Sequence, residues 1–351
     1  MAKAKQRSSS ASQRREEVKK QRQQRISSSQ NRQSQPRSSG RGRSKQKQRP
    51  WGLIVGTLLV IAAVIGVFIY LSHQSTSTAN SGGKTGSTPT SASVLNAVTH
   101  VSPTVLANVG TGGQQKILVS LKGGSPPPLV GPGGKPEFFY MGAEYCPFCA
   151  AERWSVVIAL SRFGTFSKLN QTTSSATDVY PNTPTFTFYQ SAYTSQYIDF
   201  VSVETTTNQP DGSGGYTALQ TPTAAEQDLA NKYDGPPYLS SAGSIPFIDI
   251  GNQYVMQGAN YSPDILSGHS WQDIAHDLSN SDSPITQSIV GSANYLTAAI
   301  CMATNQQPAS VCRADPVPQI EQSLNKSAFN AGGTQVGLLA PPNEGVIRQP
   351  E

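Results

Sequence analysis

Two cysteines with two residues between them stand where a strand pattern gives way to a helix pattern. The tetrad Cys146-Pro147-Phe148-Cys149 follows the apolar run Glu137 to Met141 and heads the helical stretch AAERWSVVIALSRF. The N–H groups and partial positive charge of a helix N-terminus stabilise a thiolate, so we expect Cys146 to be the nucleophile. Cys149 would then resolve its mixed disulfide, which is the chemistry of thiol–disulfide exchange.

The two residues inside the tetrad fit this arrangement. Pro147 would occupy the first helical position, where a missing N–H costs nothing. Phe148 offers an apolar contact for an unfolded substrate.

A lone C-x-x-C motif also occurs in zinc and iron–sulfur sites, and it can be a plain structural disulfide. A zinc site needs a second close pair or histidines at ligand spacing. The remaining cysteines have ten residues between them, and the histidines form no such cluster: His73, His100, His269 and His276. We therefore expect no metal and no other cofactor. A structural bridge at 146 and 149 is disfavoured because closing so short a loop removes little unfolded-state entropy.

Cys301 and Cys312 form the second couple. Four cysteines allow three pairings, and the short separation within each couple favours 146 with 149 and 301 with 312. A bridge around the loop that contains Pro308 would contribute about 3 kcal/mol in a loop-entropy estimate. We expect a structural disulfide, with a relay pair that exchanges electrons with Cys146 and Cys149 as the alternative.

The order of hydrophobic patterns predicts an α/β fold with a mixed sheet flanked by helices. Strands are expected at 116–120, 137–141, 185–190 and 197–204, and a hairpin at 245–256 has its turn at Gly251-Asn252. A glycine-rich loop is expected at 209–215. Helices are expected at 93–99, 103–108, 147–163, 223–233, 271–278, 284–303 and 316–327.

Charge is divided very unevenly along the 351 residues. Residues 1–50 carry 16 basic and 2 acidic side chains, whereas the whole chain has a net charge of only +6. The remainder is therefore acidic, which excludes a globally basic nucleic-acid-binding domain, and we expect no specific nucleic-acid partner. The basic segment has almost no large apolar residue and is expected to be a disordered tail.

An uncharged segment follows the basic tail. Residues 51–71, WGLIVGTLLVIAAVIGVFIYL, are long enough as a helix to cross roughly 30 Å of bilayer hydrocarbon. The cationic flank places the tail in the cytoplasm. A cleavable signal peptide is the alternative, but its apolar core is shorter and no A-x-A pattern follows Leu71.

These patterns define the expected domain organisation. A cytoplasmic tail (1–50), a single-pass transmembrane helix (51–71) and a flexible linker (72–92) precede a domain at 93–329 outside the cytoplasm, with a C-terminal tail at 330–351. All four cysteines lie in the domain outside the cytoplasm, where thiols can stay oxidised. The lipid bilayer is thus an expected partner.

The segment from Gly134 to Phe166, GKPEFFYMGAEYCPFCAAERWSVVIALSRFGTF, resembles thioredoxin-superfamily proteins. It is most similar to the family described as domain of unknown function 929 (DUF929), which resembles membrane-anchored thiol oxidoreductases. The resemblance implies a thioredoxin-like fold from about Ser93 to Phe329. Glu152, Arg153 and Trp154 are characteristic of the family, and we interpret them as scaffold.

The resemblance also implies roles for individual residues. Cys146 corresponds to the exposed nucleophile of the superfamily and Cys149 to its resolving cysteine. Pro246, after Ile245, corresponds to a cis-proline that packs against the redox pair and pairs with the substrate backbone. Because Pro246 lies about 100 residues after the tetrad, an insertion is expected at 172–215.

The dipeptide between the cysteines separates this chain from well-known members of the superfamily. Thioredoxin has Gly-Pro between its cysteines and the oxidant DsbA has Pro-His, whereas this chain has Pro147-Phe148. The direction of electron flow is therefore open over the roughly 150 mV between them. Glu144 can assist proton transfer, although most carboxylates at such positions are solvated or ion-paired.

The expected function is that of a membrane-anchored thiol–disulfide oxidoreductase outside the cytoplasm. Its partners would be exported cysteine-containing proteins and a membrane redox partner that resets the pair. The alternative is a non-catalytic binding module whose cysteines are structural or bind metal.

Overall fold

The computed structural model describes residues 86–114, 118–121 and 126–330. The predicted basic tail, the transmembrane helix at 51–71 and the C-terminal tail lie outside these residues, apart from Asn330. Among the helices of the described part, none has the length and apolar character needed to cross a membrane.

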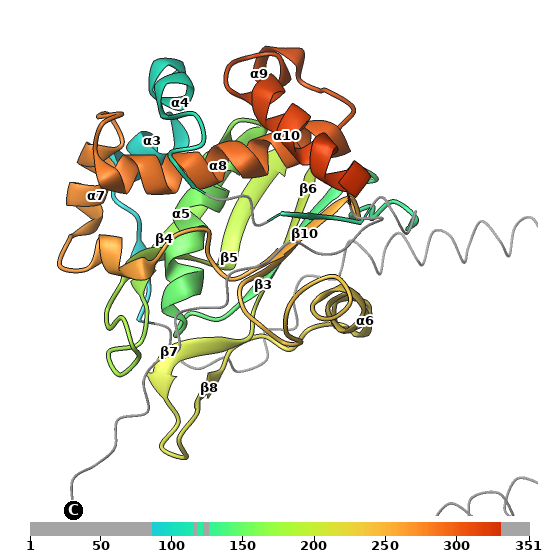
Figure 1. Ribbon diagram of the computed structural model, residues 1–351. Helices are drawn as coiled ribbons and strands as arrows, with labels where there is room; N and C mark the ends of the chain where they lie inside the picture. The colour runs from blue at the N-terminus through green and yellow to red at the C-terminus, as the bar shows by residue number, and fades with distance from the viewer. Residues whose placement is uncertain (1–85, 115–117, 122–125, 331–351) are drawn as a thin grey trace, which may run out of the picture. The chain divides into compact units, whose positions relative to one another are not determined.

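A five-stranded mixed sheet forms the centre of the domain (Figure 1). Its order is β2 (Val119–Ser120), β10 (Tyr254–Gln257), β9 (Phe247–Ile250), β3 (Glu137–Gly142) and β6 (Asp199–Glu204). Strands β3 and β6 are parallel, and the other neighbours are antiparallel. The predicted α/β class with a mixed sheet is thus confirmed.

The two faces of this sheet are covered by different helices. Alternate residues of a strand point to opposite faces, and in β3 Phe138 and Tyr140 pack in one apolar cluster with Trp154 of α5 (Pro147–Ser161). Phe139 packs on the other side, in a cluster with Tyr233 of α6 (Ala224–Tyr233). Every residue of β3 is buried as a result, so this strand holds the segment before the cysteines rigidly.

A second, three-stranded sheet packs along α5. It has the order β1 (Thr88–Pro89), β4 (Gly164–Thr173) and β5 (Pro184–Ser195), all antiparallel. The indole N–H of Trp154 donates to the carbonyl of Pro184 at 2.9 Å, which joins this sheet to the helix. Strand β4 was not predicted, because its pattern of exposed and buried residues is broken by register shifts at Phe166, Lys168 and Asn170.

Two predicted boundaries need correction. The linker was expected to continue to residue 92, but Thr88 and Pro89 pair with β4 and Ser91 caps a helix, so the folded part begins earlier. The insertion was expected at 172–215, but β6 lies within that range and belongs to the central sheet. The segment between α5 and β6 consists of β4 and β5.

The remaining elements surround these sheets. A short hairpin of β7 (Thr206–Pro210) and β8 (Tyr216–Ala218) flanks the predicted glycine-rich loop. The other helices are α3 (Ala92–Thr99), α4 (Pro103–Val109), η2 (Pro263–Leu266), α7 (Trp271–Asp277), α8 (Pro284–Ala303), α9 (Ala309–Cys312) and α10 (Val317–Asn330). Of these, η2 and α9 were not predicted because they span four residues each, too few to show a helical period.

Local sequence signals set several element boundaries correctly. Thr223 and Glu226 form the predicted capping box at the start of α6. Gly251 and Asn252 both have positive φ, at 64° and 55°, in the predicted turn between β9 and β10.

Candidate functional site

Cys146 is the N-cap residue of α5. Its backbone is extended, with φ −73° and ψ 121°, and Pro147 takes the first helical position. The Sγ atom of Cys146 accepts a hydrogen bond from the backbone N–H of Cys149 at 3.3 Å. The sulfur therefore occupies the place of a capping oxygen, where the helix N-terminus favours a negative charge.

Both cysteines of the pair are free thiols. Cys149 is fully buried, one helical turn inside Cys146. Cys146 was expected to be exposed, but only 6% of its surface is accessible. The reason is long-range packing: the Cys146 thiol donates to the carbonyl oxygen of Ile245 at 3.8 Å, and the segment around Ile245 covers it. A substrate disulfide could therefore contact only this small accessible part of Cys146.

The environment separates the two thiols by acidity. A hydrogen bond with the Cys149 side chain, the N–H of Cys149 and the nearby Arg153 charge hold the pKa of Cys146 below its ordinary value, although burial opposes them. Burial and the neighbouring Cys146 raise the pKa of Cys149 well above its ordinary value. Cys146 therefore has the lower pKa of the two thiols, which is the direction that the predicted role of nucleophile requires.

The structure brings Pro246 next to this pair. The Ile245–Pro246 peptide bond is cis, as the resemblance implies, and Pro246 is buried directly before β9. Phe148, by contrast, is 38% exposed, and its ring meets that of Tyr180 edge-on at 5.9 Å. The predicted residues 146, 149 and 246 therefore share one site, with Phe148 on its surface.

Glu144 differs from its expected setting, because it is neither solvated nor in an ion pair. Its side chain is fully buried, and among the described residues neither carboxylate oxygen accepts a well-formed hydrogen bond. The Thr187 hydroxyl is close enough to oppose the effect of burial in part. Burial dominates and raises the pKa of Glu144 to about 7. Glu144 can therefore exchange a proton near neutral pH.

A buried ion pair under the cysteines was not identified as part of the site. Arg153 donates to Glu204 from Nε at 2.9 Å and from Nη2 at 2.6 Å, and it also donates to the carbonyl of Ala143 at 2.8 Å. Both charged side chains are fully buried. The guanidinium also lies over the Tyr140 ring at 5.8 Å. The charged pair Glu152-Arg153 inside a mostly apolar helix was the available signal, but the partner of Arg153 is 51 residues away.

Three buried carboxyl groups predict that stability falls as pH rises. Burial raises the pKa of Glu144, Glu152 and Asp249 to about 7 each, from 4.5, 4.5 and 3.8. The folded chain then binds more protons than the unfolded chain between about pH 4.5 and pH 7. We expect the free energy of unfolding of the full chain to fall by at least about 2 kcal/mol across that window and then to level off.

Denaturant unfolding at a series of pH values measures this effect. Glu144→Gln should reduce the slope without loss of a hydrogen bond, because this carboxylate accepts none of good geometry. Asp228→Asn, on the exposed side of α6, is the matched control and should leave the slope as it is. Stability that rises between pH 5 and pH 7 would contradict the burial of these groups.

The second cysteine couple is bridged. Cys301 of α8 and Cys312 of α9 form a disulfide with an S–S distance of 2.03 Å, and both are buried.

This disulfide and the Cys146–Cys149 pair lie in different parts of the domain. The backbone N–H of Glu144, two residues before Cys146, donates to the carbonyl of Thr206 at 2.9 Å, so α5 begins beside β7. Figure 1 shows β7 at the bottom of the molecule and α9 at the top. This separation favours the structural role over the relay.

The described residues contain no group of three or more His, Cys, Asp or Glu side chains placed to hold a metal ion. His73 lies outside them, and the other three histidines are exposed.

Comparison with known proteins gives one match. The model of a family described as Domain of unknown function (DUF929) matches residues 128–213 and 215–302. That region contains β3, the cysteine pair, α5 and the Ile245–Pro246 step. No curated protein and no solved structure matches the chain.

Proposed function

We propose that the chain belongs to the DUF929 family, whose model matches residues 128–213 and 215–302, and that it is a thiol–disulfide oxidoreductase with a thioredoxin-like fold. The proposal places the domain outside the cytoplasm, anchored by the segment at 51–71. Its substrates would be exported proteins with cysteines, and a membrane redox partner would reset the pair. The observation that carries it is the Sγ atom of Cys146 at the N-cap of a 15-residue helix, hydrogen-bonded to the N–H of Cys149.

The arrangement of elements supports the thioredoxin-like part of the proposal. Four strands of the central sheet lie in the order β6-β3-β9-β10. Strands β3 and β6 are parallel, whereas β9 is antiparallel to both β3 and β10. Helix α5 follows β3 directly and the Ile245–Pro246 step enters β9. These elements bring the N-terminus of α5 and the Ile245–Pro246 step next to each other.

The proposed exchange conserves electrons and protons. The Cys146 thiolate attacks one sulfur of a substrate disulfide, the S–S bond breaks, and the leaving sulfur takes up a proton. Cys149 then loses its proton and attacks the Cys146 sulfur of the mixed disulfide, which releases the second substrate thiol. The pair is oxidised by two electrons and the substrate reduced. In the reverse direction the oxidised pair accepts two electrons from a substrate dithiol and passes them to the membrane partner.

Glu144 is the candidate acceptor of the proton that Cys149 must lose. Its pKa of about 7 allows it to accept and return a proton near neutral pH. Burial raises the pKa of Cys149, and the Arg153 charge offsets part of that rise. The same charge adds to the hydrogen bonds from Cys149 that lower the pKa of Cys146.

A redox titration of the full chain tests this function. The 146–149 pair should change between dithiol and disulfide at a potential between about −270 and −120 mV, as catalytic pairs do. Thiol alkylation followed by mass analysis reads the state of each cysteine, and the 301–312 bridge serves as an internal reference. A pair that resists reduction below about −300 mV would indicate an inert staple. A bound metal near one equivalent would favour the alternative binding module.

A further inference from the structure

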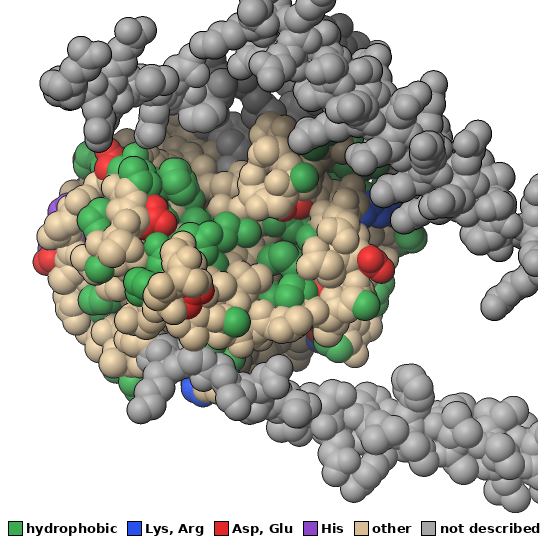
Figure 2. Space-filling model, turned by 90° about the horizontal axis from the view of Figure 1, so that it is seen from below, with side chains coloured by type: hydrophobic (Ala, Val, Ile, Leu, Met, Phe, Trp, Pro, Cys, Tyr) green, Lys and Arg blue, Asp and Glu red, His purple; other side chains and the backbone are tan. Residues whose placement is uncertain are grey.

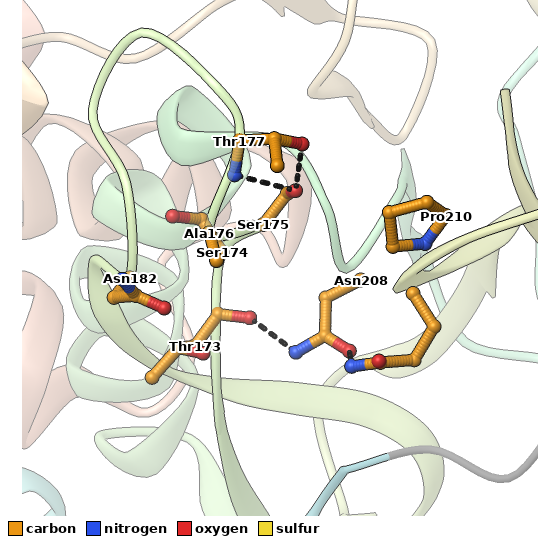
Figure 3. A pocket seen from close by; sticks show the side chains of 9 residues that line it. Thr173, Ser174, Ser175, Ala176, Thr177, Asn182, Asn208 and Pro210 are labelled. Carbon is orange, nitrogen blue, oxygen red and sulfur yellow. Dashed lines mark hydrogen bonds between the residues drawn. The ribbon is translucent and has the colours of Figure 1, made fainter. Parts of the chain in front are cut away.

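A small pocket lies beside the redox pair, between the turn that joins β4 to β5 and the end of β7 (Figure 3). Its volume of about 110 Å³ is enough for a few water molecules or a short side chain. The residues that line it are Thr173, Ser174, Ser175, Ala176, Thr177, Asn182, Asn208, Gln209 and Pro210.

Both walls of the pocket are tied to the two residues that precede Cys146. On one side, the backbone N–H of Ser175 donates to the carbonyl of Tyr145 at 2.9 Å. On the other side, the N–H of Glu144 donates to the carbonyl of Thr206, at the start of β7, at 2.9 Å. The pocket is therefore fixed to the segment that carries the reactive sulfur.

Seven of the nine lining residues are polar, and hydrogen bonds connect several of them. No residue among the nine carries a charge. Figure 3 shows the Asn208 amide spanning the two walls: its Nδ2 donates to the Thr173 carbonyl at 2.9 Å, and its Oδ1 accepts from Gln209 at 2.7 Å. Hydroxyl and amide groups both donate and accept hydrogen bonds. A charged group would find no counter-ion here, and a large apolar group would bury these polar atoms without partners.

The surface around the pocket suits a polypeptide. Phe148 and Tyr180 meet at 5.9 Å, and the rings of Tyr145 and Tyr216 stack at 4.1 Å. Figure 2, seen from the side of β7 and β8, shows hydrophobic side chains gathered in patches between polar surface. Aromatic and polar groups in alternation are typical of surfaces that bind extended chains.

We propose that this pocket is a subsite for the residue next to the reacting cysteine of a polypeptide substrate, and that it accepts a short uncharged polar side chain: Ser, Thr, Asn or Gln. This inference rests on the proposed function, because it needs Cys146 to be the reacting sulfur. It assigns the inserted β4–β5 segment a part in substrate selection.

Peptide disulfides that differ only beside the cysteine test the subsite. The full chain is assayed with peptides carrying Asn, Leu or Asp at each position flanking the cysteine. At one flanking position, we expect kcat/KM for Asn to exceed that for Leu and Asp by about tenfold, the value of one net hydrogen bond. Ala176→Leu, which fills the pocket, should bring this ratio close to one. Val179→Leu is the matched control on the same turn; Val179 is 60% exposed and does not line the pocket, so the ratio should persist.

The outcomes separate the subsite from the proposed function. Equal rates for all three peptides, or an Asn preference that survives in Ala176→Leu, would overturn the subsite while the exchange activity stands. Failure of the unmodified chain to react with glutathione disulfide as well would instead overturn the proposed function.

Discussion

Replacement of Cys146 by serine is expected to lower the rate of disulfide exchange by at least about a hundredfold, because the thiolate and not a hydroxyl is the nucleophile. This substitution should remove the thiol with little disturbance of the helix. Cys146 is an N-cap whose sulfur accepts the N–H of Cys149, and serine is among the best N-cap residues. The helix should therefore keep its cap while the reaction is lost. Insulin reduction and oxidation of a dithiol peptide both measure the loss.

Cys149→Ser is the matched partner of this variant. Cys149 is fully buried and one turn inside the helix, so its loss should leave the first attack intact and remove only the resolving step. Mixed disulfides between Cys146 and substrate should then accumulate and be visible on non-reducing gels. The double variant should form none. Undiminished exchange by Cys146→Ser would rule out the proposed function.

Replacement of Glu204 by alanine is expected to cost about 3–5 kcal/mol of unfolding free energy, because it leaves the Arg153 charge buried and unpaired. Arg153 and Glu204 are both fully buried and share two hydrogen bonds. Denaturant unfolding of the full chain measures the loss. Asp228→Asn is the exposed control and should stay within about 0.5 kcal/mol of the parent.

Glu204→Gln tests the electrostatic role of the same pair with less disturbance of packing. With the carboxylate charge removed, the Arg153 charge acts on the cysteines uncompensated, so the pKa of Cys146 should fall further. A more stable thiolate stabilises the reduced pair, and its reduction potential should rise. Alkylation rate against pH reads the first effect, and the redox titration reads the second. An unchanged pKa in a folded variant would show that Arg153 and Glu204 act only as scaffold.

The sequence by itself determined the helix starts and turns that depend on only a few neighbouring residues. The cysteine spacing and Pro147 predicted the start of α5, Thr223 and Glu226 the start of α6, and Gly251-Asn252 the turn between β9 and β10. Caps, turns and apolar periodicity act over one or two helical turns, so a single stretch of sequence contains all the information they need.

Only the tertiary structure decided how the site is buried and what surrounds it. Cys146 is covered by Ile245, 99 residues away, and Arg153 meets Glu204 across 51 residues. Glu144 is fully buried, and the group beside its carboxylate is Thr187 of β5, which is 43 residues away in the sequence. Ser175 reaches Tyr145 only because β4 and β5 fold back along α5. Burial, and with it the pKa of each group, depends on contacts between distant segments, and no local pattern contains them.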